Sequence, residues 1–551
     1  MKKHLYLLVW AALLLICTPS TTTAQYLHWG TNLTGPPTSL TVEGQKNLYV
    51  SGSGLSLAYI TQFDSAGYQL WNRGFKSSFT SVSISDIQLD GQGGMYVLGN
   101  FNTQVILNHF TPQADTLSGL GGNDIFLAHF DAIGQTIWAF VLGGSGDDGA
   151  SQLVRDAAGN LYLSGSFTSS VDFDPGPTST TLSSAGQTDL FVASYDVNGD
   201  FRWAKSAGGF GIDWSAGIGV HDSIVYVGGT ITGTGDFDPI DSLSTINAFG
   251  TDAFIAAYDT LGQFHWVKGM GGMARDIARK FLIDASGYLY LAGDFEGPAD
   301  FDPSDSTYQL TPVGESDIFF AKYSPEGEFL LAGSVGGPDY DRGWGMSVDN
   351  QERIYLMGQF GNQIDVDPGD STVMLNGTGM DNMFFSIYDS LGDFQWVHSL
   401  EAAPSSRFIV PDDDGNFYVG GTFFYGDSMY IDPMGGPAAL IRTSSENAFL
   451  IKYAFYPKTY IATSLEPHDD EPGWHLFPNP AQDFLNVKVS GQNILKRVRL
   501  LDIQGRLLIE KAAESGQQIS FAVGHLAKGM YMVQLEDQSG KRYSRRFIKS
   551  E

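Results

Sequence analysis

The chain has 551 residues and a formal net charge of −30, with 31 Lys and Arg against 61 Asp and Glu. The last 78 residues carry a net charge of +5, so the acidic excess lies in the long part before them. Nucleic acids and anionic membrane surfaces attract basic proteins, and the composition disfavours both as partners of this acidic part. Aromatic residues at 13%, charged residues at 17% and 67 glycines are typical of short strands joined by tight turns.

Residues 1–24 are a predicted signal peptide. Lysines at positions 2–3 precede an apolar run over 5–16, and a small polar stretch leads to a cleavage site between Ala24 and Gln25. The run is too short for a transmembrane helix, so no membrane-spanning segment is expected in the mature chain. Cys17 is the one cysteine, and an alternative interpretation makes it a lipoprotein signal despite the bulky residue before it. The mature chain then has no cysteine with which to form a disulfide.

One short segment recurs seven times between residues 25 and 455. It is an apolar run that in most copies ends in Tyr-Asp or Phe-Asp, and from the second copy onward the spacing is close to 64 residues. A second run, of the type LYLSGS, also occurs seven times. Such regular self-similarity indicates an array of one supersecondary unit, here four antiparallel strands joined by short turns. The copies of the first run are 57–64, 124–131, 189–196, 252–259, 317–324, 382–389 and 447–454.

A turn of the form Asp-x-x-Gly joins the third and fourth strands of most units. We predict that the Asp side chain caps its own turn and that Gly supplies the positive φ angle. The turns are 64–67, 131–134, 196–199, 259–262 and 389–392.

A tryptophan marks the fourth strand of most units, and one copy is displaced. Trp29 stands near the start of the mature chain, before any complete unit, whereas the array ends on a third strand at 447–454. We therefore predict that a strand at about 26–33 pairs alongside 447–454 and completes the last sheet, which leaves no open end to the array.

The strand pattern, together with a Gly-Gly-x-Gly-x-Asp connection, resembles the bacterial seven-bladed propeller repeats often called SBBP repeats, over roughly residues 26–455. The resemblance implies an all-β fold for residues 25–455, a seven-bladed β-propeller closed by its N- and C-terminal strands. It implies nothing about the ligand.

The long connections of each unit are predicted to share one face of the ring. Binding residues favour loops on a rigid scaffold, so this face is the predicted binding surface. The connections between units begin with Gly-Gly and carry carboxylates and two tryptophans, namely Asp147, Asp148, Asp213, Trp214, Asp276, Asp339, Asp341 and Trp344.

The connection between the second and third strands carries a recurring Asp-x-Asp-Pro motif. In an extended segment the two carboxylates point to one side, an arrangement that suits a hard cation such as Ca²⁺, with further oxygens supplied by the loop or a neighbouring unit. The alternative is that the apolar middle residue plugs the edge of the sheet while Asp and Pro form a turn. The candidate calcium ligands are Asp172, Asp174, Asp236, Asp238, Asp300, Asp302, Asp365 and Asp367.

The sequence contains no recognisable nucleophile elbow, zinc-protease motif or phosphate-binding loop, and its ten histidines form no repeated set. We therefore assign no catalytic residue. Glycosidases need only two well-placed carboxylates, so a polysaccharide hydrolase or lyase is kept as an alternative.

Residues 456–473 read as a linker, and 474–551 have a different composition, with positive charge and short alternating strands. The order of Pro-Asn-Pro, Asp-x-x-Gly-Arg, Gly-x-Tyr and a basic last strand resembles the type A C-terminal sorting domain of type IX secretion. That resemblance implies a small seven-stranded, Ig-like β-sandwich read by an outer-membrane translocon of a Gram-negative bacterium. The residues that carry it are Phe477, Pro478, Asn479, Pro480, Asp502, Gly505, Gly529, Tyr531 and Lys549.

These observations predict an exported, non-catalytic propeller at the cell surface or in the medium. Its partners would be the type IX machinery, through the tail, and an extracellular glycan or protein, through the acidic face. A polymer-degrading enzyme and a structural component of a surface layer are the two alternatives.

Overall fold

The computed structural model describes residues 24–33, 35–43, 47–54, 56–77, 81–107, 115–238, 244–377, 382–400, 404–423, 428–431, 433, 439–441, 447–456, 474–477, 483–489, 495–501, 507–512, 518–526, 529–537 and 542–549. Every regular element among them is a β-strand, and no helix in these ranges could cross a membrane. The chain divides into two compact units, Met1–Thr459 and Tyr460–Glu551. The predicted signal peptide, apart from Ala24, and most of the predicted linker lie outside the described residues.

Most described strands of the first unit form seven antiparallel groups of four, numbered here as sheets 1 to 7. Within sheets 1 to 6 the order follows the chain, as expected for hairpin-connected units. Sheet 1 contains β2 (Pro37–Glu43), β3 (Asn47–Gly52), β4 (Leu57–Asp64) and β5 (Gln69–Lys76); sheet 2 contains β6 (Val82–Leu89), β7 (Met95–Ile106), β8 (Thr116–Phe130) and β9 (Thr136–Gly144); sheet 3 contains β10 (Gly149–Arg155), β11 (Leu161–Phe167), β14 (Asp189–Tyr195) and β15 (Phe201–Ala207); sheet 4 contains β16 (Trp214–His221), β17 (Ile224–Asp236), β18 (Thr245–Asp259) and β19 (Phe264–Gly272). The pairing of Lys76 in β5 with Ile106 in β7 joins sheets 1 and 2 into one continuous sheet.

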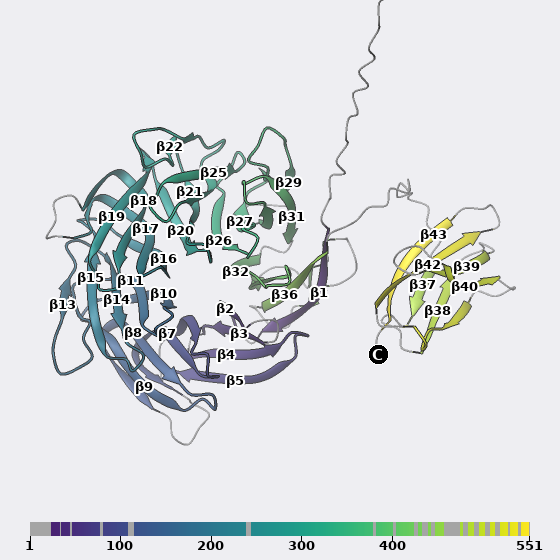
Figure 1. Cartoon of the computed structure of the whole chain (residues 1–551), viewed down its shortest axis with the longest axis horizontal. Coiled ribbons are helices and arrows are strands. Elements are labelled where there is room, and N and C mark those ends of the chain that lie inside the picture. Colours follow the sequence, from purple (N-terminus) through teal and green to yellow (C-terminus); the bar gives the residue numbers. More distant parts are fainter. Residues whose placement is uncertain are drawn as a thin grey trace, which may run out of the picture. The chain divides into compact units, whose positions relative to one another are not determined.

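The remaining three groups repeat this pattern, and the last draws its fourth strand from the N-terminus. Sheet 5 contains β20 (Asp276–Ile283), β21 (Leu289–Phe295), β24 (Asp317–Tyr323) and β25 (Phe329–Val335); sheet 6 contains β26 (Arg342–Val348), β27 (Ile354–Phe360), β30 (Asn382–Tyr388) and β31 (Phe394–Leu400); sheet 7 contains β32 (Pro404–Pro411), β33 (Phe417–Phe423), β36 (Asn447–Tyr456) and β1 (Ala24–Leu33). The seven groups follow one another around a common centre, with their first strands innermost (Figure 1).

The pairing predicted for the N-terminal strand is present. β1 runs antiparallel to β36 from Ala24 opposite Tyr456 to Leu33 opposite Ala448, with Trp29 opposite Lys452. The indole of Trp29 also reaches sheet 1, where its Nε1 donates a hydrogen bond to the carbonyl of Ser65 at 3.2 Å. Trp138 and Trp203 make the corresponding bond to the turn of the following sheet, at 3.3 and 3.0 Å. The displaced strand therefore makes the contact between sheets that its counterparts make.

The Asp-x-x-Gly turns have the conformation that the sequence predicts. In each turn one carboxylate oxygen accepts backbone hydrogen bonds from the residues two and four positions ahead, for example Ala66 and Tyr68 at Asp64, at 3.0 and 2.9 Å. The glycines have φ between 81° and 86°, which L-residues with a Cβ rarely adopt. Asp131, Asp196, Asp259 and Asp389 repeat the pattern.

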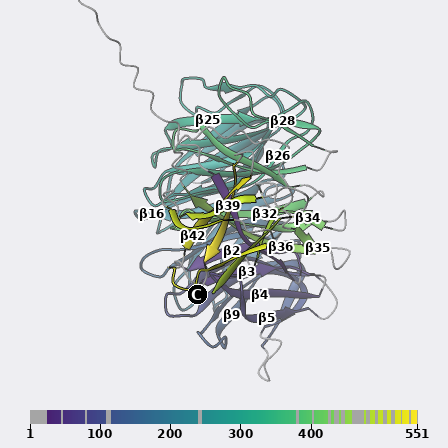
Figure 2. The same ribbon diagram turned by 90° about the vertical axis from the view of Figure 1, so that its right-hand side faces the viewer.

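The connections between second and third strands form short hairpins in four sheets. The hairpins are β12 (Ser170–Asp172) with β13 (Thr181–Ser183), β22 (Ala299–Asp300) with β23 (Gln309–Leu310), β28 (Gln363–Asp365) with β29 (Met374–Asn376), and β34 (Ser428–Tyr430) with β35 (Ala439–Ile441). In the side view of Figure 2, β28, β34 and β35 lie on the same side of the first unit. Two of the hairpins also pair with the previous sheet, where β12 joins β9 and β22 joins β19.

The second unit contains two sheets around one apolar core. The core side chains are Leu485, Val487, Phe521 and Val523 from one sheet and Val498, Leu500, Val533 and Leu535 from the other. The strands are β37 (Trp474–Phe477), β38 (Phe484–Val489) and β41 (Gln518–Ala522) in the first sheet, and β39 (Leu495–Leu501), β40 (Leu507–Ala512), β42 (Gly529–Asp537) and β43 (Arg542–Lys549) in the second.

Candidate binding face and sorting tail

The Asp-x-Asp-Pro motif fastens each long connection to the sheet before it. The first Asp of the motif lies opposite the first Gly of the preceding Gly-Gly pair, as Asp172 opposite Gly143 and Asp300 opposite Gly271. The same pairing occurs as an isolated bridge at Asp236 with Gly208 and at Asp365 with Gly336. The motif therefore lies where two neighbouring sheets meet.

The carboxylates of the motif accept hydrogen bonds from their own loops. Oδ1 of Asp172 accepts from the backbone N–H groups of Asp174 and Thr180, at 3.1 and 2.8 Å, and Asp300 and Asp365 bind their loops in the same way. The second carboxylate accepts from the backbone two residues on at Asp174, Asp302 and Asp367. The middle residue is fully buried at Phe173, Phe237, Phe301 and Val366. No group of three or more His, Cys, Asp or Glu side chains suited to a metal occurs among the described residues.

A buried tyrosine anchors each of these loops, which the sequence analysis did not anticipate. The last Tyr of the third strand donates its hydroxyl to the carbonyl of the middle residue, as Tyr195 to Phe173 at 2.7 Å and Tyr323 to Phe301 at 3.0 Å. Tyr258, Tyr388 and Tyr453 make the same bond at 2.9 to 3.0 Å. The recurring Tyr-Asp ending was visible in the sequence, but only the fold shows that its tyrosine holds a loop 22 residues earlier.

Replacing Tyr323 by Phe should therefore lower the free energy of unfolding by about 1–2 kcal/mol, because the buried carbonyl of Phe301 loses its donor. Urea denaturation of the full chain measures this difference. Tyr68→Phe is the matched control, since Tyr68 is 73% exposed and should show no change. Equal stability of the two variants would contradict the anchoring role.

Four of the carboxylates predicted for the binding face are buried between sheets. Asp148, Asp213, Asp276 and Asp341 are at most 2% exposed. Each accepts a hydrogen bond from the second Gly of its Gly-Gly pair, at 2.6 to 2.9 Å. Asp148, Asp213 and Asp341 also accept one from the chain just after the second strand, at Thr168, Thr232 and Gly361. They hold the connections in shape.

Each of these carboxylates has a buried acidic neighbour on the third strand of the preceding sheet. The neighbours are Asp124, Asp189, Asp252 and Asp317, and each pair is 24 residues apart in sequence. Burial, reinforced by the charge of the neighbour, raises the pKa of Asp148 and Asp213 to about 6 and that of Asp276 and Asp341 to about 7. Burial also raises the pKa of Asp252 and Asp317 to about 6.

The other residues predicted for this face lie closer to solvent. Asp147 is exposed and accepts hydrogen bonds from the backbone and side chain of Asn123 at 2.9 and 3.2 Å, and half-buried Asp339 binds Asn362 in the same way. Trp344 is 37% exposed and Trp214 is half-buried; both line the centre of the unit.

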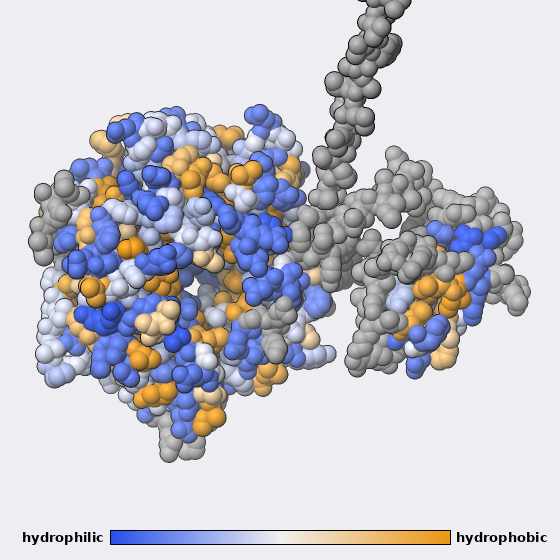
Figure 3. Space-filling model, viewed as in Figure 1, coloured by the Kyte–Doolittle hydropathy of each residue, from blue (hydrophilic) through white to orange (hydrophobic). Residues whose placement is uncertain are grey.

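Apolar side chains that the sequence analysis missed are exposed on the same connections and on β18. Phe210 is 90% exposed, Met273 86% and Phe249 81%. Phe210 and Met273 directly follow a Gly-Gly pair, and this position is the signal that could have identified them. Seen along the axis in Figure 3, the surface is mainly hydrophilic with scattered hydrophobic residues, so these side chains are local features.

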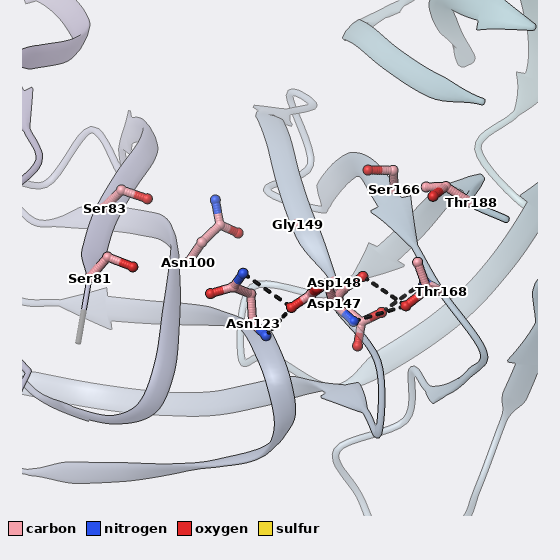
Figure 4. A pocket seen from close by; sticks show the side chains of 10 residues that line it. All are labelled: Ser81, Ser83, Asn100, Asn123, Asp147, Asp148, Gly149, Ser166, Thr168 and Thr188. Carbon is pink, nitrogen blue, oxygen red and sulfur yellow. Dashed lines mark hydrogen bonds between the residues drawn. The ribbon is translucent and has the colours of Figure 1, made fainter. Parts of the chain in front are cut away.

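A polar pocket of about 540 Å³ opens between sheets 2 and 3, beside Asp147 and Asp148 (Figure 4). Hydroxyl and amide groups line it: Ser81, Ser83, Asn100, Asn123, Ser166, Thr168 and Thr188. Hydrogen bonds to Asp147 and Asp148 fix Asn123 and Thr168, whereas the hydroxyls of Ser81, Ser83, Ser166 and Thr188 have no partner among the described residues. The pocket therefore offers fixed walls and unsatisfied hydroxyl groups.

In the second unit, four of the predicted sorting residues lie in paired strands. Gly529, at the start of β42, lies opposite Lys549, at the end of β43, and Tyr531 lies opposite Phe547. Phe477 ends β37 opposite Asn486, and Lys549 is buried. Pro478, Asn479, Pro480, Asp502 and Gly505 lie outside the described residues.

Comparison with known families identifies the tail. Residues 475–550 match the family described as the secretion system C-terminal sorting domain. The tail therefore directs the protein through type IX secretion to the cell surface or the extracellular space, as the sequence analysis predicted.

The chain is similar at low identity to two curated proteins. The chain is 22% identical over 491 residues to an uncharacterised WD repeat-containing protein, L264, of Acanthamoeba polyphaga mimivirus, covering 76% of this chain and 35% of that protein. It is 28% identical over 201 residues to the regulatory protein FlaEY of Caulobacter vibrioides, covering 36% and 20%. The chain thus spans about a third or less of the length of these curated relatives.

Solved structures are similar at low scores. A fungal alcohol oxidase in complex with copper aligns with 11% identity and a TM-score of 0.39, covering 96% of this chain and 100% of that one. The extracellular domain of a putative one-component system, BT4673, of B. thetaiotaomicron aligns with 9% identity and a TM-score of 0.23, covering 96% and 98%.

Proposed function

We propose that this protein is an exported binding module without catalytic activity. In this proposal a seven-bladed β-propeller of the SBBP type binds the ligand, and an Ig-like tail directs secretion. The grouping of strands into seven sheets and the pairing of β1 with β36 support the propeller. The sorting tail supports a role outside the cell, where glycans and other proteins are the available partners.

The polar pocket between sheets 2 and 3 carries the proposal. Its free hydroxyls and amides suit a ligand rich in hydroxyl groups, and its size is typical of small-molecule sites. Exposed Phe210, on the connection after sheet 3, and Phe249, in β18, offer flat apolar surfaces against which sugar rings could stack. The favoured ligand is therefore an extracellular glycan.

Binding of neutral oligosaccharides to the purified full chain, measured by isothermal titration calorimetry, tests this function. Thr188→Val removes one pocket hydroxyl at nearly constant volume and should weaken binding about fivefold to tenfold, because one hydrogen bond is lost. Ile133→Ala is the control, since Ile133 is 77% exposed on a short turn outside the pocket.

The same titrations separate the alternatives. Binding without shortened products supports the module, whereas released oligosaccharides would establish an enzyme, and self-assembly without binding would establish a structural component. Repeating the titrations with Ca²⁺ and with EDTA tests the calcium hypothesis for the Asp-x-Asp-Pro loops, which predicts tighter binding or a higher melting temperature with Ca²⁺.

A further inference from the structure

The first strand of every sheet in the described first unit carries a β-bulge at the same place. In each, the pairing with the second strand skips one residue near the middle or start of the first strand. Bulges re-aim a side chain and are enriched beside functional sites. The skipped residues are Thr38, Ser85, Ser151, Ala216, Arg279, Trp344 and Arg407.

All seven skipped residues line one central cavity of about 660 Å³, around which the first strands run in Figure 1. The ring that they form is asymmetric. Sheets 1 to 4 contribute small residues, three of them with hydroxyl groups, whereas sheets 5 to 7 contribute Arg279, Trp344 and Arg407. A cavity with hydroxyls on one side and a cationic and aromatic wall on the other is suited to an asymmetric ligand.

The charge of this cavity is opposite in sign to that of the unit around it. Arg279, Lys280 and Arg407 line it, and Asp86 is the carboxylate among its lining residues. Arg279 forms a salt bridge with Asp294 and Lys280 has Asp86 as its charge neighbour, so Arg407 is the cation of this wall for which the described residues show neither. Asp86 is already bound by the backbone N–H groups of Ile87 and Leu153, at 2.8 and 3.1 Å. Lys280 faces the cavity directly after the bulge. A local cationic site within an acidic shell attracts an anion only at that place.

Arg279 and Trp344 of this wall are held in position by contacts within the protein. Asp294, which is 3% exposed, accepts hydrogen bonds from Nε and Nη2 of Arg279. The guanidinium carbon of Arg279 lies 4.6 Å from the ring centre of Trp344, whose Nε1 donates to Gln359 at 3.1 Å. Arg407 is exposed to the cavity. Groups fixed in this way lose little conformational entropy on binding.

We propose that the central cavity is a second binding site, for the charged end of an anionic oligosaccharide. Arg407 and Lys280 contact the anionic group, and Trp344 contacts the sugar ring. The hydroxyls of sheets 1 to 3 contact the sugar hydroxyls. The chemistry fits a uronate or a sulfate alike, since both present planar or clustered oxygens to a guanidinium group. The acidic surroundings select a short chain or a chain end over a long polyanion. This site is separate from the pocket between sheets 2 and 3.

Calorimetric titration of the full chain with trigalacturonate, an unsaturated chondroitin sulfate disaccharide and uncharged maltotriose tests the proposal. At least one of the two charged sugars should bind through the cavity, and its affinity should fall as ionic strength rises. Arg407→Gln should weaken that binding about tenfold or more, because a charge-assisted hydrogen bond is lost. Trp344→Phe should weaken it by a smaller factor.

The control is Lys76→Gln, which makes the same change of charge at an exposed residue of β5, away from the cavity. It should leave the affinity unchanged, and so should Thr188→Val, which tests the other pocket. Failure of both charged sugars to bind, or equal affinity of the Arg407→Gln variant and the native chain, would overturn the proposal. Because Arg407 is exposed, the circular dichroism spectrum and the melting temperature of the Arg407→Gln variant should match those of the native chain.

Discussion

A chain that begins at residue 35 should fail to show the cooperative unfolding of one that begins at residue 25. Removal of β1 leaves the outer edge of β36 without its antiparallel partner and removes the bond from Trp29 to sheet 1. The expected loss is about 5 kcal/mol or more, which is comparable with the whole stability of a typical domain. The uncovered edge, with Leu450 and Ile451 buried beside it in the native protein, should also promote aggregation.

Thermal unfolding followed by circular dichroism, with hydrogen exchange of the β36 amides, measures this effect. A rearranged chain provides the control. Ala24 lies opposite Tyr456, so residues 24–33 can be moved to follow Tyr456 through an Asp-x-x-Gly turn of the kind that the other sheets use. This chain should recover the native melting behaviour. Equal melting temperatures of the truncated and native chains would show that the pairing of β1 with β36 does not stabilise the protein.

The displaced strand was predictable because the signal was repetition. A Trp at five other positions defined the pattern of a fourth strand, and Trp29 could be recognised by comparison with them. The turn aspartates were predictable for a similar reason, since an Asx cap acts over four residues and needs no knowledge of the fold. Structural features that depend on short, repeated sequence patterns can therefore be predicted from a single sequence.

The residues that shape the candidate sites were not predictable in this way, because they act across sheets. A β-bulge at Arg279 or Arg407 depends on the register between two strands, which no local pattern in those strands records. The raised pKa of Asp276 likewise depends in part on the charge of Asp252, which lies within a strand of the previous sheet. The constant spacing of 24 residues was present in the sequence, but it gains meaning only when the fold brings the two carboxyls together.

The four buried carboxyl pairs should make the stability of the first unit fall as pH rises from about 4 to about 7. Their folded-state pKa values of about 6 to 7 lie above the unfolded value near 4, so the native state binds protons that the unfolded state has released. The stabilising contribution is complete below the unfolded pKa and is lost as pH passes the folded pKa. One pKa unit corresponds to about 1.4 kcal/mol, so each pair should change stability by about 2–4 kcal/mol across this range.

Unpaired oxygens within these pairs give the structural reason. Oδ1 of Asp252 and Oδ1 of Asp276 are both buried without a hydrogen-bond partner among the described residues, as are Oδ1 of Asp124 and Oδ1 of Asp317. A proton on one carboxyl supplies a donor and removes the repulsion between two buried charges. Sheet 6 avoids the problem by composition. It has Asn382 at the start of its third strand and Ser406 at the partner position, and the Asn382 amide donates to the carbonyl of Gly361 at 2.6 Å.

Asp276→Asn should therefore raise the free energy of unfolding at pH 8 by about 1–3 kcal/mol while changing it little at pH 5. Its side-chain carbonyl can still accept the bond from Gly272, which Asp276 accepts at 2.6 Å. Chemical denaturation of the full chain across this pH range measures the change, and Asp305→Asn, at an exposed loop position, makes the same charge change as a control. Asp252→Asn should raise the free energy of unfolding at pH 8 by a similar amount. The double variant should be little more stable than either single variant, because one amide already removes the repulsion between the two carboxylates. A native stability that is constant between pH 5 and 8, or additive gains in the double variant, would show that the two carboxyls titrate independently.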